Sequence, residues 1–192
     1  MGLDMYLVKT KRVAGLDYHE AMPKVWDLLP ITTSREVPAQ PYLQEGVLEE
    51  KIGAGAAALL EGFSLKKIEG SKGTLYMIYP YTEVGYWRKA NAIHHWFVVN
   101  VQYGEDDCRY YEVTREHLLA LEEKVELALE AFKAKNFTDC EYHLPTQGGF
   151  FFGSTDYDDW YETALQDTLL VVQNALNQTD WENDILLYQS SW

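Results

Sequence analysis

Residues 85–97 read Gly-Tyr-Trp-Arg-Lys-Ala-Asn-Ala-Ile-His-His-Trp-Phe and bring more chemistry together than any other stretch of the chain. Placed on a helix at about 100° per residue, the polar groups fall on two neighbouring stripes. These are Arg88, Asn91 and His95 on one stripe, and Trp87, Asn91 and His94 on the other. The remaining positions are apolar almost all round, which is typical of a largely buried helix. We therefore predict a central helix over residues 86–102.

Charged and imidazole groups on a buried helix are unfavourable unless something pairs with them. Arginine offers a rigid fork for phosphate or carboxylate, lysine a point charge, and tryptophan a flat face for a ring. These residue types suit a pocket for an anionic, ring-containing ligand. The structural alternative is that Arg88 pairs with a carboxylate, His94 bonds a carbonyl, and the tryptophans belong to the core. The predicted ligand residues are Trp87, Arg88, Lys89, Asn91, His94 and Trp96.

A second candidate segment, residues 144–155, reads Leu-Pro-Thr-Gln-Gly-Gly-Phe-Phe-Phe-Gly-Ser-Thr. Consecutive glycines let the backbone approach a ligand closely, and Thr146 and Gln147 supply a hydroxyl and an amide to it. Ser154 and Thr155 precede a predicted helix, whose first N–H groups favour an anion. The alternative is a hairpin in which the glycines form the turn and the phenylalanines pack inside. The spacing of a Walker loop or a dinucleotide fingerprint is missing.

A third group consists of carboxylates and aromatic rings: Asp156, Asp158 and Asp159 with Tyr157, Trp160 and Tyr161. Clustered acids can hold Mg²⁺ or act as acid and base in hydrolysis. Acids in the first turn of a helix equally suit the helix dipole, and we favour that interpretation. Side chains of the adjacent pair His94-His95 diverge on a helix, and no metal-binding cysteine or histidine spacing occurs. We expect no metal and no cofactor.

Composition limits the class of protein. With 192 residues, of which 47% are hydrophobic, the chain is long enough to bury a core, and we predict one domain over residues 1–192. Thirty acidic against sixteen basic residues give a net charge of −14, which disfavours duplex nucleic acid and anionic membranes as partners. Two cysteines, no signal peptide and no long apolar run indicate a cytoplasmic protein.

The patterns along the chain predict an α+β fold with a small, mostly antiparallel sheet and three to four helices. The expected strands are residues 2–9, 65–68, 74–79, 109–113 and 185–189, with 65–68 and 74–79 forming a hairpin. Besides the central helix, we expect helices over 17–29, 47–60, from the N-cap Thr114 to 135, and from a Thr155/Asp158 capping box to 176. Residues 30–43 carry three prolines and are expected to form a loop.

Four motifs resemble a family of small bacteriophage and prophage proteins. They are Met1-Gly-Leu-Asp-Met-Tyr-Leu, Val84-Gly-Tyr-Trp-Arg-Lys-Ala-Asn-Ala-Ile-His94, Pro145-Thr-Gln with Gly149-Phe-Phe-Phe-Gly-Ser-Thr, and Tyr188-Gln-Ser-Ser-Trp192. The resemblance spans the chain and is weakest over residues 10–75. It implies a viral protein that acts in the cytoplasm of an infected bacterium. Some small phage proteins act as sponges, which bind and hide the nucleotide second messenger of a defence system.

Three functions are compatible with these observations, and we favour the first. The chain binds and sequesters a small anionic, nucleotide-like molecule, as a homodimer, without turning it over. Alternatively, it is an acidic interaction protein that inhibits a host protein through the carboxylates of residues 116–133. Third, it is a phosphoryl or glycosyl hydrolase in which His94 acts with Asp156 or Asp158.

Overall fold

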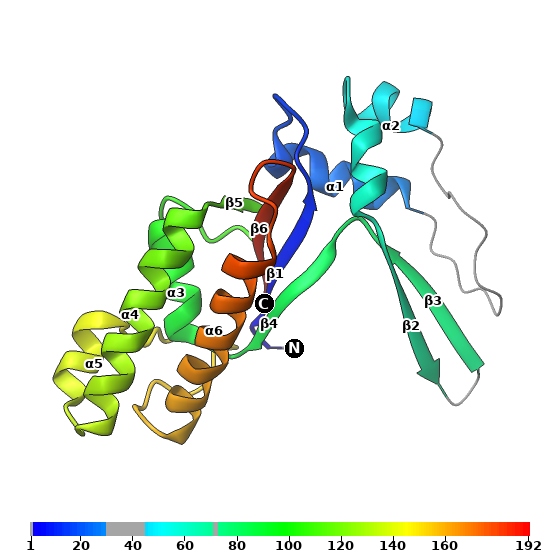
Figure 1. Ribbon diagram of the computed structural model, residues 1–192. Helices are drawn as coiled ribbons and strands as arrows, with labels where there is room; N and C mark the ends of the chain where they lie inside the picture. The colour runs from blue at the N-terminus through cyan, green and yellow to red at the C-terminus, as the bar shows by residue number, and fades with distance from the viewer. Residues whose placement is uncertain (1, 30–44, 71–72) are drawn as a thin grey trace. The chain divides into compact units, whose positions relative to one another are not determined.

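The computed structural model describes residues 2–29, 45–70 and 73–192 (Figure 1). Its strands are β1 (Asp4–Lys11), β2 (Ser64–Gly70), β3 (Gly73–Tyr79), β4 (Thr82–Arg88), β5 (Tyr111–Val113) and β6 (Asp184–Ser191). Its α-helices are α1 (Tyr18–Leu28), α2 (Glu45–Lys51), α3 (Asn91–Asn100), α4 (Arg115–Lys133), α5 (Phe137–His143) and α6 (Asp159–Gln178). A 3-10 helix, η1, covers Ala56–Gly62. The predicted α+β class is confirmed, although the described residues form more helices than the three to four expected.

The strands form two sheets. An antiparallel four-stranded sheet has the order β4-β1-β6-β5, so the first and last strands of the chain lie side by side at its centre. A separate two-stranded sheet pairs β2 with β3, from Ser64 opposite Tyr79 to Gly70 opposite Gly73, which confirms the predicted hairpin. The expected loop over residues 30–43 lies outside the described residues.

The chain forms two compact units. The first consists of Met1–Val8, Glu83–Trp181 and Leu186–Trp192, and the second of Lys9–Thr82 and Glu182–Ile185. Strands β1 and β6 contribute residues to both. All eight predicted ligand residues lie in the first unit. That residues 1–192 form one domain stays a prediction.

The core of the first unit is built by helices packed together and against strands. Helix α4 packs along α5 and α6, and α6 also contacts α3 (Figure 1). Phe97 of α3 stacks on Tyr188 of β6 with ring centroids 4.0 Å apart. Strand β4 approaches α6 so closely that a Cβ on Gly85 would lie 2.3 Å from Val171 Cγ1. A larger residue at position 85 would force the Val171 side chain or the backbone to shift.

Capping residues and glycines in the sequence mark helix ends in the structure. Thr114 caps α4 as predicted, because its hydroxyl accepts from the backbone N–H of His117 while the His117 ring accepts from Thr114 N–H. The helix expected over 47–60 is divided into α2 and η1, with Gly53 and Gly55 at positive φ between them.

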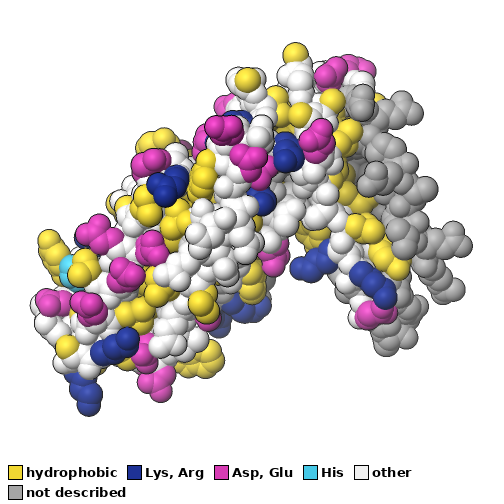
Figure 2. All heavy atoms as spheres, in the orientation of Figure 1, with side chains coloured by type: hydrophobic (Ala, Val, Ile, Leu, Met, Phe, Trp, Pro, Cys, Tyr) yellow, Lys and Arg dark blue, Asp and Glu magenta, His cyan; other side chains and the backbone are white. Residues whose placement is uncertain are grey.

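The surface of the chain carries both signs of charge. Figure 2 shows acidic side chains scattered over the visible face among basic and apolar ones. Within the described part of the chain, none of the helices combines the length and the apolar character needed to span a bilayer.

Candidate ligand-binding site

The helix predicted over residues 86–102 is wrong: this segment is a strand followed by a shorter helix. In β4 the burial alternates, with Trp87 inward and Arg88 outward, which is the two-residue period of a strand. Lys89 then adopts a left-handed conformation with φ of 57°, and α3 begins at Asn91. The helical stripes that joined Trp87 and Arg88 to Asn91 therefore do not exist, and the polar groups point in several directions.

Both tryptophans are core side chains, not the stacking surface that was predicted. Trp87 is 3% exposed, and its indole Nε1 donates a 2.9 Å hydrogen bond to the Thr168 hydroxyl of α6. Trp96 is buried with its ring set edge-on against Phe97. The structural alternative holds for these two residues, since large aromatic side chains release most free energy when they are buried.

Asn91 positions the loop that follows α5. Its side chain is 4% exposed, and Nδ2 donates to the carbonyl oxygens of Phe152 (3.1 Å) and Ser154 (2.7 Å). Its Oδ1 accepts from the backbone N–H of Gln147 at 3.0 Å. Both amide hydrogens are used by these bonds, so the predicted role in binding a ligand directly is replaced by a role in holding the loop.

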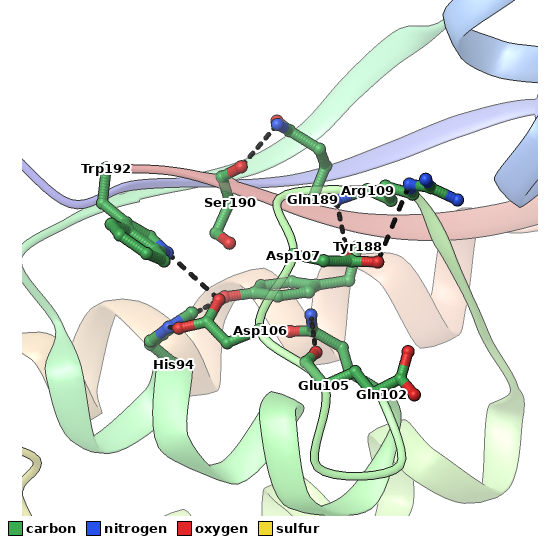
Figure 3. A network of polar contacts seen from close by, with 10 residues as sticks. All are labelled: His94, Gln102, Glu105, Asp106, Asp107, Arg109, Tyr188, Gln189, Ser190 and Trp192. Carbon is green, nitrogen blue, oxygen red and sulfur yellow. Dashed lines mark hydrogen bonds and ion pairs between the residues drawn. The ribbon is translucent and has the colours of Figure 1, made fainter.

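His94 is buried and belongs to a polar network that reaches the surface at Trp192 (Figure 3). Its Nδ1 lies 2.8 Å from the Tyr188 hydroxyl, its Nε2 lies 3.0 Å from Asp106 Oδ2, and Trp192 Nε1 donates to Asp106 Oδ1 at 3.1 Å. Burial lowers the pKa of His94, although Asp106 opposes this. In the neutral ring that satisfies these partners, Tyr188 donates to Nδ1 and Nε2–H donates to Asp106. The predictions of His94 as a ligand residue and as a partner of Asp156 or Asp158 are both wrong.

A cavity of about 500 Å³ lies beside the junction between β4 and α3. A volume of this size suits a small organic molecule. Its polar lining comprises Arg88, Lys89, Asn91, Thr146, Ser154, Asp156 and Asp158. Its other walls include Ala90, Ile93, Gly153, Trp160, Tyr161, Ala164 and Leu165. The start of α3, the loop before α6 and the first turns of α6 therefore converge on one hollow.

Two cations reach this cavity. Arg88 is mostly exposed, and its Nη1 lies 3.5 Å from Asp4 Oδ1. The ammonium group of Lys89 makes no ion pair or hydrogen bond with any described residue. A Cβ on Gly2 would lie 3.4 Å from Arg88 Nη2 and 3.5 Å from Lys89 Cε, so both side chains lie close to the backbone of Gly2 and near each other. The positive φ of Lys89 is unfavourable for a residue with a side chain, and such strain is concentrated at functional sites.

Thr146 and Gln147 have different surroundings. Thr146 lines the cavity, and its hydroxyl donates to the carbonyl oxygen of Thr155 at 2.9 Å. Gln147 contributes its backbone N–H to Asn91, and its side chain is not part of the cavity wall. Of the eight predicted ligand residues, four line the cavity: Arg88, Lys89, Asn91 and Thr146. The amide hydrogens of Asn91 are occupied by the loop, which leaves Arg88, Lys89 and Thr146 as the candidates for contact with a ligand.

The predicted anion site at the start of α6 is also wrong. The helix is capped by Asp158 and not by Thr155, because Asp158 Oδ1 accepts from the N–H groups of Trp160 (3.0 Å) and Tyr161 (3.1 Å). A carboxylate already satisfies these donors, so an anion gains little from the helix N-terminus.

The cavity also contains two residues that the favoured sequence interpretation did not predict to bind a ligand, Trp160 and Asp156. Trp160 is 80% exposed, and the Asp156 carboxylate, like the Lys89 ammonium, has no hydrogen bond or ion pair with the described residues. The buried residues of α6 include Tyr161, Leu165 and Thr168, so the helical period places Trp160 off the buried face.

Gly153 is expected to be required for the cavity wall. It has φ of +92°, and a Cβ there would lie 3.2 Å from Lys89 Cβ. Gly153→Ala should lower the free energy of unfolding by about 2 kcal/mol, from backbone strain and crowding together. Gly104→Ala is the matched control, because Gly104 has a similar φ of +85° but no atom within 4 Å of its Cβ position. Urea denaturation measures both, and equal losses would show that crowding against Lys89 is negligible.

Comparison with protein-family models, curated proteins and solved structures finds no match to this chain. Over the described ranges, no three His, Cys, Asp or Glu side chains are grouped so that they could hold a metal ion. The cavity beside Lys89 is therefore the candidate ligand-binding site.

Proposed function

We propose that this chain binds and sequesters a small phosphorylated, nucleotide-like molecule in the cavity beside Lys89. The main support is that one hollow is lined both by Lys89, whose ammonium group has no partner among the described residues, and by the exposed Trp160. A cation that the protein leaves unneutralised attracts an anion, and an exposed indole offers a stacking surface to a base. A nucleotide supplies both groups.

Each part of the ligand has a suitable partner. Lys89 and Arg88 lie together and would neutralise a phosphate, with Lys89 contributing more because Arg88 is already near Asp4. Thr146 lines the same cavity, and because its hydroxyl donates to the Thr155 carbonyl oxygen, it can accept a hydrogen bond from a ribose hydroxyl of the ligand. The base would stack on Trp160, where such contacts contribute about 1–3 kcal/mol per base. The net charge of −14 does not prevent this, since binding depends on the local cations.

Sequestration is the role we propose for this binding. The predicted resemblance to bacteriophage proteins is the reason for proposing a ligand that a host defence system uses as a messenger. Hiding such a messenger requires affinity but no chemical step. Cytoplasmic location in an infected bacterium and a homodimeric state stay predictions of the sequence.

Lys89→Gly is expected to separate binding from stability. Removing a charge-assisted hydrogen bond should weaken nucleotide binding about tenfold to a hundredfold. The free energy of unfolding should stay the same or rise by up to about 1 kcal/mol, because glycine adopts the left-handed conformation without strain. Calorimetry or native mass spectrometry with a panel of linear and cyclic nucleotides measures binding, and thermal unfolding measures stability.

Lys135→Gly provides the matched control, since Lys135 also has φ of 57° but does not line the cavity. It should show the same change in stability with unchanged binding. Failure of the unaltered protein to bind any nucleotide of the panel would refute the proposal. Chromatography of the recovered ligand distinguishes the alternatives: intact nucleotide supports sequestration, and a shifted product means that the site is catalytic.

A further inference from the structure

We infer that the cavity selects guanine nucleotides through Asp156. This inference rests on the proposed function and concerns the base of the ligand. Its starting point is that acidic side chains in the wall of a phosphate-binding cavity oppose the binding of the phosphate. Asp156 and Asp158 both line it, and each would repel a purely anionic ligand. The ligand must therefore present hydrogen-bond donors to this wall as well as a phosphate to Lys89.

The two carboxylates are not equivalent. Asp158 is engaged by the backbone N–H groups at the start of α6. Asp156 is exposed, and its backbone N–H donates to the Ser154 hydroxyl at 3.1 Å, which fixes the local turn while leaving the carboxylate unpaired among the described residues. Asp156 is thus the acceptor that a bound molecule can use.

The stacking surface determines which part of the nucleotide meets Asp156. Trp160 follows Asp156 by four residues and lines the same cavity. A base that stacks on the Trp160 ring directs its edge, and not its face, toward the neighbouring wall. An ionised carboxylate has two oxygens and only accepts hydrogen bonds, so it matches an edge with two adjacent donors.

Guanine is the common base with that edge, since its ring N1–H and its 2-amino group lie side by side. Adenine and cytosine each place a ring nitrogen acceptor next to the amino group, and this acceptor would face the second carboxylate oxygen. Uracil offers one ring N–H, which lies between two carbonyl groups. Hypoxanthine also offers one ring N–H, which lies between a carbonyl group and a C–H group. The carboxylate of Asp156 therefore favours guanine over the other bases. A base that lacks one of the two donors leaves a carboxylate oxygen without a hydrogen bond and binds more weakly.

The test is calorimetry with four nucleoside monophosphates: GMP, IMP, XMP and AMP. GMP should bind about tenfold tighter than IMP, which lacks the 2-amino group, because one charge-assisted hydrogen bond at an exposed carboxylate is lost. Asp156→Asn should remove this preference and improve XMP binding relative to GMP, since an amide offers one donor to the 2-carbonyl group and one acceptor to N1–H. Asp159→Asn, which changes an exposed acid outside the cavity wall, should leave all four affinities unchanged.

Equal affinities for GMP, IMP and XMP would overturn the inference while leaving the proposed nucleotide binding intact. A fifth ligand, 2′-deoxy-GMP, tests the ribose. The inference also fails if GMP and IMP bind alike but 2′-deoxy-GMP binds more weakly than GMP, because Asp156 would then contact the ribose. If no nucleotide of either panel binds the unaltered protein, the proposed function itself fails. Melting temperatures of both variants verify that they are folded.

Discussion

Asn91→Ala is expected to lower the free energy of unfolding by about 3 kcal/mol, because it removes three buried or half-buried hydrogen bonds to backbone groups. The carbonyl oxygens of Phe152 and Ser154 and the N–H of Gln147 would lose their common partner. Since these residues belong to the loop that forms one wall of the cavity, nucleotide binding should be lost together with stability. Urea denaturation and calorimetry measure the two effects.

Asn91→Asp makes the prediction more specific. It keeps the acceptor for Gln147 but turns a charged oxygen toward two carbonyl oxygens, so it should destabilise the fold at least as much as alanine does. Asn100→Ala, in the last turn of the same helix, is the control. Asn100 is exposed, and within the described ranges its side chain bonds only the Trp96 carbonyl oxygen, so the variant should lose about 0.5 kcal/mol of stability. Similar losses for Asn91 and Asn100 variants would contradict the proposed positioning role.

His94→Leu is expected to destabilise the chain by about 3 kcal/mol at neutral pH. Leucine has a similar volume, so the loss reports hydrogen bonds more than packing. The buried Tyr188 hydroxyl would lose its acceptor, and burial raises the pKa of Tyr188 well above its ordinary value, so this hydroxyl keeps its proton and needs a partner. Asp106 would lose the donor that connects it to α3.

Comparing the stability of the wild type and of His94→Leu at several pH values should report the protonation of His94. Burial lowers the pKa of folded His94 below its usual value of about 6.5, so the unfolded chain binds this proton more readily. The stabilisation that neutral His94 provides is therefore present above about pH 6.5 and is lost as the pH falls through the lower pKa of the folded state. The difference in stability between wild type and His94→Leu should narrow between pH 7.5 and 5, by at most about 1.4 kcal/mol per pH unit.

Tyr188→Phe retains His94 and serves as the control. It should destabilise the chain by about 1–2 kcal/mol yet keep the pH dependence that His94→Leu loses. A stability gap between wild type and His94→Leu that stays constant or widens toward acid would contradict a lowered pKa of His94.

Elements with local signals were predicted well. Thr114 caps the N-terminus of α4, and the apolar residues on the inner face of this helix are buried, as their spacing indicated: Leu118, Leu121, Val125 and Leu129. The hairpin of β2 and β3 followed from two strand-like runs separated by a glycine-containing turn. In these segments the residues that determine the structure are close together in sequence.

The segment 86–102 failed for the opposite reason. An apolar run without clear periodicity fits a buried strand as well as a buried helix. The choice depends on a partner far away in the sequence, because the N–H of Lys89 donates to the Leu3 carbonyl oxygen at 2.8 Å beside the pairing of β4 with β1. Strand β4 ends at Arg88, and Lys89 follows it in a left-handed conformation.

The sequence alone indicated where in the chain the candidate site lies, in a mid-chain basic and aromatic segment and the loop 144–155. Only the tertiary structure decided which groups remain available to a ligand. Burial satisfied Trp87, Asn91 and His94 with internal partners, whereas the folding of α6 against α3 placed Lys89, Asp156 and Trp160 around one cavity. The physical reason is that a hydrogen bond or ion pair depends on distances between atoms, and these distances are set by contacts between segments remote in the chain.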